Sequence, residues 1–391
     1  MPQEKIVLFY KNLISVGGAE LLLCKHYQYL RGLGREVIII CFQNKSLDRV
    51  DINQEDVLEL KQKNPFLRIV FLAYYLFKLR PSYAFCHSGY IDFGIASIIS
   101  RTKFSTFIHQ PTTMSFNEMD KLSIFFFKRY KNFVKKDFMF KKINSIRKEM
   151  SPRKKIFINV RTIISQIILK SSERLFVLSK YAKNEKKDIF KLNSTYLSGA
   201  IESNNLLNLD QPLNPPSDGI YQFVTVSRLD ENKRIDVILH ALKILDEEGY
   251  KFKFTVCGDG PARRSLEDLA KKLNITQNVN FLGYVPESEI KKIYHQMDLF
   301  ITIDWADFRI TTYEVLLHNK KLVVSSDTDV DDWLLKSGYL YASCPDSKNL
   351  SKIIKESLSS KIYCSNEDLK EYLSNFTWDN YFRSIDKVIR S

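Results

Sequence analysis

The chain has 391 residues, 45% of them hydrophobic, a length that exceeds one compact domain and predicts two. Its six cysteines are widely spaced without a CxxC pair, no apolar run reaches the roughly 18 residues that cross a bilayer, and the opening MPQEKIVLFYKN is too weakly apolar for a signal peptide. These features argue against a disulfide framework, a zinc site and a membrane-spanning protein, and they predict a cytoplasmic protein without a structural metal. The net charge is +14, and its meaning depends on where along the chain the cations lie.

The first half of the chain alternates strands and helices. Strands are predicted at 5–10, 37–42, 82–87, 103–109 and 174–179, and helices at 19–30 and 68–79. Strands interleaved with helices of this length predict a parallel sheet covered on both faces. The first domain is therefore expected to be an α/β, doubly wound, Rossmann-like domain over residues 1–200.

A basic insertion interrupts this alternation at 112–172. Within it, residues 121–170 contain fifteen Lys or Arg against Asp137 and Glu149, and the cations alternate with aromatic residues. A helix in a lipid interface has this composition, and anionic lipid attracts each cation near its surface by about 1 kcal/mol. The segment predicts contact with an anionic membrane surface. A solvated basic helical pair whose aromatics pack on the domain is the alternative, whereas no recognised nucleic-acid module surrounds the patch.

The second half repeats the alternation after a change in composition. Residues 201–219 are rich in Asn, Pro and Ser, which is typical of a linker. Beyond it, strands at 221–227, 251–258, 279–285, 298–303 and 321–326 are separated by helices, which predicts a second Rossmann-like domain over 220–375. Ligands of doubly wound sheets bind at the carboxyl ends of the strands, so we expect an active site in a cleft between the two domains.

Glycines and cations at the ends of these strands suit an anionic ligand. Gly17 and Gly18 lead into the first helix, where backbone can approach a ligand and the helix N-terminus favours an anion. Arg228 and Lys233 follow the strand at 221–227, and two fixed cations could hold a nucleotide diphosphate. Taken singly, each pattern also fits an ordinary tight turn or an exposed basic loop.

Two further strand ends are candidates. In CGDGP, Gly258 and Gly260 could open room for a nucleoside, although the motif alone also fits a flexible turn. His109 ends the strand in FIHQP, and His87 in FCHSG occupies an equivalent but weaker position. A lone histidine is more often a core or surface residue.

The order of GGAE, the histidine strand end, SRLDENKR, GDGP, FLGYVPESEIKKIYHQMDLFIT and the carboxylate stretch DWADFRITTYEV resembles one family. It is similar to the retaining, nucleotide-sugar-dependent glycosyltransferases of family four, which have the two-domain GT-B fold. The resemblance is strongest over 221–345. FIHQP and DFRITTYE look most like the mannosyltransferase-type branch, and the ending, 376–391, resembles the closing helix that crosses back to the first domain.

The resemblance implies a role for each matching position. Gly17 and Gly18 would lie against the donor phosphates, and Arg228 and Lys233 would neutralise the leaving diphosphate without a metal. Glu314 would bind the ribose hydroxyls, and His109 would lie near the transferred sugar. The remaining implied donor contacts are Gly258, Asp259, Val285, Phe308, Arg309, Ile310 and Thr311.

The chain departs from the family pattern in the carboxylate stretch. Ala306 stands where the family has the glutamate that grips the transferred sugar, and Arg309 stands where glycine is usual. Asp307 is the neighbouring carboxylate and the candidate substitute. The implied function is transfer of a hexose from a UDP- or GDP-linked sugar, with no other cofactor and no nucleic acid, to a polyprenyl-linked saccharide acceptor at the inner face of the cytoplasmic membrane. The alternatives are a catalytically impaired binding or scaffolding relative and another sugar-nucleotide enzyme such as an epimerase.

Overall fold

The computed structural model describes residues 4–13, 18–45, 52–109, 111, 123–124, 126, 128–129, 147–202, 219–304, 310–327 and 330–390. The chain forms two compact units. Unit 1 consists of Met1–Ser198 together with Trp378–Ser391, and unit 2 is Gly199–Thr377. Of the expected linker at 201–219, residues 203–218 lie outside the described residues.

Unit 1 is built on a parallel sheet. Among the described residues this sheet has seven strands in the order β5-β3-β1-β6-β7-β8-β9. Its strands are almost continuously apolar because helices cover both faces. They are β1 Lys5–Phe9, β3 Glu36–Cys41, β5 Val57–Glu59, β6 Tyr83–Cys86, β7 Phe104–Ile108, β8 Leu175–Val177 and β9 Thr195–Tyr196, and a separate short pair is formed by β2 Asn12–Leu13 and β4 Gln43–Asn44.

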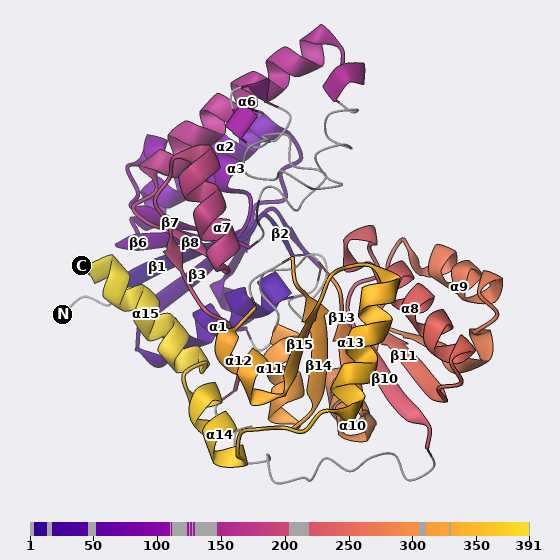
Figure 1. The fold of residues 1–391 in the computed structure, drawn as a ribbon. Coiled ribbons are helices and arrows are strands. Elements are labelled where there is room, and N and C mark those ends of the chain that lie inside the picture. The colour runs from indigo at the N-terminus through magenta and orange to yellow at the C-terminus, as the bar shows by residue number, and fades with distance from the viewer. Residues whose placement is uncertain are drawn as a thin grey trace. The chain divides into compact units, whose positions relative to one another are not determined.

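The helices of unit 1 fall into two groups. Helices α2, α3 and α6 pack side by side, and α15 packs on α1 (Figure 1). The bounds are α1 Gly18–Gly32, α2 Pro65–Leu79, α3 Tyr90–Ser100, α6 Pro152–Ser171, α7 Lys180–Glu185, the π-helical turn η5 Lys186–Phe190 and α15 Trp378–Arg390, with a 3-10 turn η2 at Gln54–Asp56. No helix among the described residues has both the length and the apolar character to traverse a bilayer.

Helix α15 follows unit 2 in sequence but belongs to unit 1. It buries Tyr381, Phe382 and Ile385, and the Phe382 ring stacks on the ring of His26 in α1 with 4.8 Å between centroids. Its Asp386 accepts hydrogen bonds from Tyr29 and Arg35. The contact is therefore both aromatic and charged.

Unit 2 repeats the parallel architecture. Its described sheet has six strands in the order β12-β11-β10-β13-β14-β15, so the strand order reverses between β10 and β13. The strands are β10 Tyr221–Val226, β11 Phe252–Cys257, β12 Val279–Gly283, β13 Leu299–Thr302, β14 Lys321–Ser325 and β15 Leu340–Ser343. The helices are α8 Ile235–Glu247, α9 Arg263–Lys272, α10 Glu287–Gln296, α11 Ile310–Leu317, α12 Asp332–Ser337, α13 Ser347–Ser359 and α14 Asn366–Ser374, with 3-10 turns η7 Glu231–Lys233 and η8 Thr276–Asn278.

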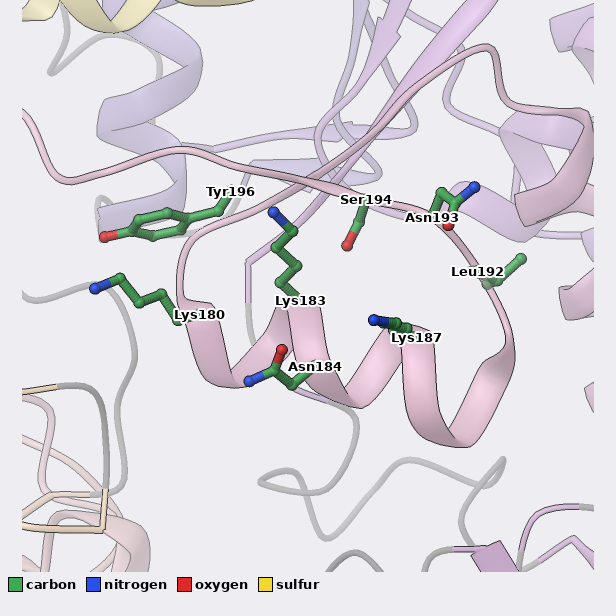
Figure 2. Close-up of a pocket in the computed structure, with 8 residues that line it drawn as sticks. All are labelled: Lys180, Lys183, Asn184, Lys187, Leu192, Asn193, Ser194 and Tyr196. Carbon is green, nitrogen blue, oxygen red and sulfur yellow. The ribbon is translucent and has the colours of Figure 1, made fainter.

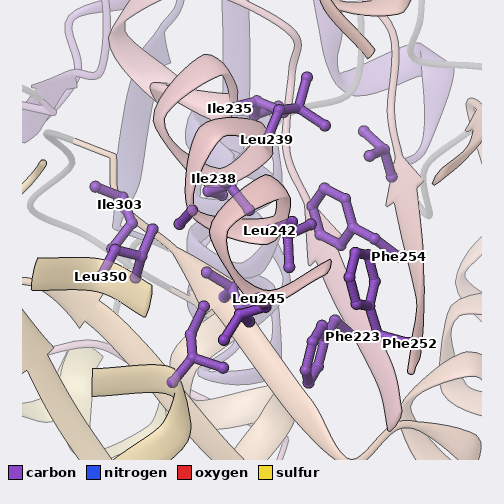
Figure 3. Packing of buried hydrophobic residues seen from close by; sticks show 14 of the residues in the cluster. Phe223, Ile235, Ile238, Leu239, Leu242, Leu245, Phe252, Phe254, Ile303 and Leu350 are labelled. Carbon is purple, nitrogen blue, oxygen red and sulfur yellow. The ribbon is translucent and has the colours of Figure 1, made fainter. Parts of the chain in front are cut away.

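The core of unit 2 shows why its sequence pattern predicts the fold well. Helix α8 carries apolar residues at helical spacing, and its Ile238, Leu242 and Leu245 lie over Phe223 and Phe254 of the sheet (Figure 3). All five side chains are fully buried. A stripe of this kind against β-strands is the expected solution for an amphipathic helix.

The predicted alternation is confirmed as two doubly wound units, but helices α3, α12, α13 and α14 were not predicted. Helix α3 occupies Tyr90–Ser100, between two predicted strands, and its sequence YIDFGIASIIS is rich in isoleucine. Gly89, with φ of 74°, precedes the helix, and Phe93 and Ala96 on its inner face are fully buried. Packing between α2 and α6 stabilises a helix here despite the low helix propensity of β-branched residues.

Candidate functional site

Several predicted site residues cannot be placed. Gly17, Asp307, Phe308 and Arg309, together with Ala306, lie outside the described residues. Their roles stay predictions, and the description below concerns the others.

Lys233 lies where the strand order of unit 2 reverses. The turn η7 follows β10, and Asp304 follows the neighbouring strand β13. The Nζ of Lys233 lies 2.7 Å from Oδ2 of Asp304, and the hydroxyl of Thr302 donates to the other carboxylate oxygen at 2.9 Å. The Asp304 side chain is only 6% exposed. A buried carboxylate thus fixes Lys233 at the carboxyl edge of the sheet, the edge where doubly wound folds bind ligands.

Arg228 lies between β10 and η7, with its side chain in solvent. Its side chain is 72% exposed, and its Nε lies 3.1 Å from Oδ2 of Asp230. Exposed ion pairs of this kind contribute about 0–1 kcal/mol. The guanidinium can therefore exchange Asp230 for an incoming anion at little cost.

Gly258 and Gly260 have a packing role that the sequence did not reveal. A Cβ on Gly258 would lie 1.9 Å from the carbonyl oxygen of Ser227, and one on Gly260 would lie 2.5 Å from that of Leu229. The amide of Leu229 also donates to the carbonyl of Asp259 at 3.0 Å. Because neither glycine has a Cβ, the turn at 257–261 can pack directly on the backbone of Ser227 and Leu229, and this contact positions the segment that carries Arg228. Their predicted contact with a nucleoside stays a prediction.

Asp259 and Val285 flank the same edge of unit 2. The Asp259 carboxylate accepts from the amide of Gly260 at 2.7 Å and lies 3.6 Å from Arg263, with its side chain 60% exposed. Val285 follows β12 and packs, partly buried, against the core that contains Tyr294. Both residues are thus present at the edge that carries Arg228.

Glu314 lies in α11, which begins at Ile310 and includes Thr311. The hydroxyl of Tyr294, a residue of α10, donates to Oε2 of Glu314 at 3.3 Å. Burial, with the nearby Glu314 carboxylate adding, raises the pKa of Tyr294 well above its usual value. Tyr294 therefore remains a hydrogen-bond donor that orients the carboxylate, a partner that sequence reasoning missed because it lies twenty positions away on another helix.

Unit 1 brings three histidines together. His87 follows β6 and His109 follows β7, while His26 comes from α1. The Nδ1 of His26 lies 3.0 Å from Nε2 of His87, one ring nitrogen donating to the other, and the His87 and His109 ring centroids are 6.0 Å apart. Burial, with Arg35 adding, lowers the pKa of His26 to about 3, and burial lowers that of His109 to about 4. Burial also lowers the pKa of His87 well below its usual value.

His109 retains a free ring nitrogen. Its Nε2 is buried and has no hydrogen-bond partner within the described part of the chain. A neutral imidazole at a strand end, with one nitrogen available, can donate to or accept from a sugar hydroxyl. His26, by contrast, gave no signal in the sequence, since a histidine inside an amphipathic helix has no distinctive pattern.

The first glycine-led helix is also partly described. Helix α1 begins at Gly18, and Glu20 in its first turn accepts a hydrogen bond from Tyr10 at 2.8 Å. This carboxylate interacts favourably with the helix N-terminus. It also reduces the positive potential that Gly18 would offer a phosphate.

A basic pocket of about 690 Å³ opens on unit 1 between α7, η5 and β9 (Figure 2). Lys180, Lys183 and Lys187 come from successive helical turns and share the pocket with Ser194 and Tyr196 of the returning segment. No Asp or Glu is among its described lining residues. Three ammonium groups gathered in one pocket suit a phosphate or another anionic group.

Metal ligation has no candidate centre in the described residues, where no three His, Cys, Asp or Glu side chains gather closely enough to hold an ion. All six cysteines are free thiols, and four of them are buried. Arg228 and Lys233, each ion-paired with a carboxylate, remain the predicted partners of a diphosphate.

Comparison with known proteins agrees with this geometry. Residues 211–375, which lie in unit 2, match the family model "Glycosyl transferases group 1". Alpha-monoglucosyldiacylglycerol synthase of Streptococcus pneumoniae is 26% identical over 185 residues, covering 47% of this chain and 42% of that protein. The putative colanic acid biosynthesis glycosyltransferase WcaL of Escherichia coli is 29% identical over 91 residues, covering 23% and 22%. The chain thus spans well under two thirds of these relatives.

A solved structure extends the likeness to the whole chain. Alr3699/HepE of Anabaena, solved in complex with UDP and glucose, superimposes with a TM-score of 0.70 at 15% identity and covers 100% of both chains. The chain has the GT-B fold of glycosyltransferases, as predicted, and its second unit carries the group 1 glycosyltransferase match. The retaining mechanism and the mannosyltransferase-type branch remain predictions from the family resemblance.

Proposed function

We propose that this protein is a metal-independent, retaining glycosyltransferase that moves a hexose from a UDP- or GDP-linked sugar to a membrane-associated saccharide acceptor. The observation that carries the proposal is the Lys233–Asp304 pair at the strand reversal of a unit that matches group 1 glycosyltransferases. Both family resemblance and the UDP- and glucose-bound neighbour support a nucleotide-sugar donor.

The chemistry assigned to unit 2 is charge neutralisation. As the bond between sugar and diphosphate breaks, negative charge grows on the leaving phosphate. Arg228 and Lys233 stabilise that charge, and they do so more strongly in the transition state than in the ground state. Lys233 is already positioned by Asp304, so little reorganisation is needed when the donor binds. Glu314, oriented by Tyr294, holds the ribose hydroxyls.

The transferred sugar is assigned to His109 and Asp307. His109 offers to a sugar hydroxyl its Nε2, which has no partner among the described residues. Asp307 takes the role of the glutamate that the family has at the position of Ala306. Gly17 and Gly18 approach the donor phosphates. The family resemblance supports these assignments and the retention of anomeric configuration.

The acceptor is proposed to be a polyprenyl-linked saccharide in surface-polysaccharide assembly, met at the inner face of the cytoplasmic membrane. The names of the two curated relatives, one a glycolipid synthase and one a colanic acid glycosyltransferase, support this class of acceptor. The lysine pocket of unit 1 is the candidate position for the acceptor phosphate, because Lys180, Lys183 and Lys187 line it together.

The test is a panel of UDP- and GDP-sugars. Thermal stabilisation by one nucleotide, followed by slow hydrolysis of its sugar, would identify the donor, and an NMR spectrum of the product would show the anomeric configuration. Lack of binding to every nucleotide sugar would overturn the proposal. Ala306 motivates a second candidate, a catalytically impaired relative with a binding or scaffolding role. If the protein has this second function, we expect tight nucleotide binding with neither hydrolysis nor transfer of the sugar.

A further inference from the structure

Helix α2 has an apolar face that nothing among the described residues covers. Its inner face buries Leu72, Ala73 and Leu76 against the sheet. Its outer face is also apolar, with Phe66 73% exposed and Phe77 62% exposed, and Leu67, Val70, Phe71 and Tyr74 lie between them. A helix that is apolar all round is normally enclosed by other structure or by lipid.

Helix α6 is apolar on two faces. The face directed into unit 1 buries Ile158, Ile168 and Leu169 together with Thr162 and Ser165, and Ser165 hydrogen-bonds Tyr90 of α3 at 2.7 Å. The opposite face carries aliphatic and aromatic side chains that are 37 to 64% exposed, namely Ile156, Phe157, Val160, Ile163, Ile164 and Ile167. The inward side chains already supply the apolar contacts with unit 1, so the second apolar face on the outside needs a separate cause.

The two outer faces form one surface. Helix α3 packs against both α2 and α6 and adds the exposed Ile98 and Ile99 (Figure 1). We call the exposed apolar side chains of α2, α3 and α6 the α2–α6 face. It contains fourteen of the twenty large hydrophobic residues that are exposed in the described chain. Such concentration, as opposed to single scattered residues, marks an interaction surface.

The charges on the two longest of these helices have one sign. Helix α2 carries Lys78 and also Arg68, whose guanidinium lies over the buried Phe42 ring, and α6 carries five cations, with Arg153, Lys154 and Lys155 together in its first turn. Neither helix contains an Asp or Glu. Cations beside exposed apolar and aromatic side chains are the composition of a helix that lies in a lipid interface.

We propose that the α2–α6 face docks on the surface of an anionic lipid bilayer, with the helices parallel to the membrane plane. The apolar side chains enter the boundary between headgroups and acyl chains, and the cations contact lipid phosphates. This surface differs from the aromatic part of the basic insertion at 125–140 and adds α2 and α3, which the sequence analysis did not connect with a membrane. The inference deepens the proposed function and rests on it for its use, since a lipid-linked acceptor is met at such a surface.

A bilayer explains this surface better than a second copy of the chain does. Two copies joined through the α2–α6 face would bring cations against cations, and like charges across an interface cost several kcal/mol. An anionic bilayer supplies the opposite charge and an apolar phase at once.

The experiment measures co-sedimentation of the whole chain with vesicles that contain phosphatidylglycerol, compared with pure phosphatidylcholine vesicles. We expect binding to the anionic vesicles that weakens when NaCl is raised to about 0.5 M, because salt screens the cations. An apolar variant, Phe66→Ser, Phe77→Ser and Ile167→Ser, is expected to bind about tenfold more weakly. A cation variant, Arg153→Gln, Lys154→Gln and Lys155→Gln, should lose a similar amount and most of the salt dependence.

Matched controls change exposed residues elsewhere. The apolar control is Leu33→Ser, Leu335→Ser and Tyr363→Ser, and the cation control is Lys272→Gln, Lys348→Gln and Lys352→Gln. Both are expected to bind vesicles as the unchanged protein does. Equal losses in controls and test variants would overturn the proposal, as would vesicle binding that survives both test variants.

Two further measurements separate the alternatives. Sedimentation velocity without lipid reports self-association, and a dimer abolished by the apolar variant would assign the face to a second copy instead. Nucleotide stabilisation measured on the same preparations reports the proposed function. Vesicle binding without nucleotide binding supports the docking surface alone, and the reverse result overturns only the docking surface.

Discussion

Lys233 and Asp304 form a 2.7 Å ion pair at the carboxyl edge of the unit 2 sheet, with Lys233 21% and Asp304 6% exposed. The pair leaves Lys233 fixed in position and electrically balanced when no anion is bound. A diphosphate arriving at this edge would therefore find an ammonium group whose side-chain entropy has already been lost, which favours binding.

Removing this cation tests its assigned role. Lys233→Gln is expected to weaken UDP or GDP binding about tenfold, since a charge-assisted hydrogen bond is lost. Isothermal titration calorimetry measures the affinity. Lys243→Gln is the control, because Lys243 is also half-buried and ion-paired, with Asp246 at 3.3 Å, but lies within α8. Equal affinities of the two variants would remove Lys233 from the binding site.

Glu314→Ala is expected to weaken donor binding strongly, because no other group is assigned to the ribose. A double-mutant cycle makes the test specific: the unchanged protein and the variant are each titrated with UDP or GDP and with the 2′,3′-dideoxy nucleotide. If Glu314 contacts the ribose hydroxyls, the variant does not discriminate between the two ligands. Tyr294→Phe should show a smaller loss, since it removes only the group that orients Glu314. Undiminished discrimination by Glu314→Ala would refute the ribose assignment.

Gly258→Ala is expected to destabilise the protein by roughly 3 kcal/mol or more, since overpacking and backbone strain both contribute. The new Cβ would lie 1.9 Å from the Ser227 carbonyl oxygen, and φ at this position is 127°. Gly249→Ala is the comparison, because its φ of 85° is also positive but no atom lies within 4 Å of the added Cβ. It should cost only about 1 kcal/mol. Urea unfolding measures both, and similar costs would show that the contact with Ser227 is unimportant.

The buried histidines predict acid sensitivity of unit 1. Their pKa values in the fold, about 3 for His26 and about 4 for His109, are below the usual 6.5, so below pH 6.5 the unfolded chain binds protons that the fold does not. Stability is thus fully present above pH 6.5 and falls as the pH drops towards 4, by up to about 1.4 kcal/mol per pH unit for each histidine.

Urea unfolding between pH 7 and pH 4 measures this slope. His26→Gln is expected to reduce it, because glutamine keeps a hydrogen bond to His87 but does not titrate. His240→Gln, at an exposed position of α8, serves as the control and should leave the slope unchanged. A slope that is the same for all three proteins would contradict the assignment to His26.

The lysine pocket predicts an effect on one substrate only. Lys183→Gln should raise the KM for a lipid-linked phosphate acceptor about tenfold while the KM for the nucleotide sugar stays the same. Lys61→Gln, on unit 1 with its side chain 78% exposed, is the matched control. Equal changes in both KM values would argue against a pocket for the acceptor phosphate.

The fold was largely predictable, because buried parallel strands are continuous apolar runs and their helices carry regular stripes. Helices α3 and α6 were harder to predict from the sequence. Helix α3 has the isoleucine content of a strand and forms a helix only through its neighbours. Helix α6 buries Ile158, Ile168 and Leu169 but exposes six other apolar side chains, so its apolar pattern does not show which side faces the domain.

Candidate site residues were predictable only where one motif contains them. Arg228 and Lys233 were predicted from their place after a strand, and Glu314 from the family resemblance. The contacts that hold two of them come from other elements, Asp304 from the segment after β13 and Tyr294 from α10, and no local pattern joins such residues. The histidine cluster likewise depends on α1, β6, β7 and α15 meeting in space.

Helix α15 has a consequence for the order of folding during synthesis. Unit 2 is one continuous segment, Gly199–Thr377, whereas unit 1 needs residues from both sides of it. A ribosome, which makes the chain from its N-terminus, therefore completes unit 2 before Phe382 can cover His26. The unit that is begun first is finished last, and until then the α1 surface around His26 is exposed to chaperones and to premature association.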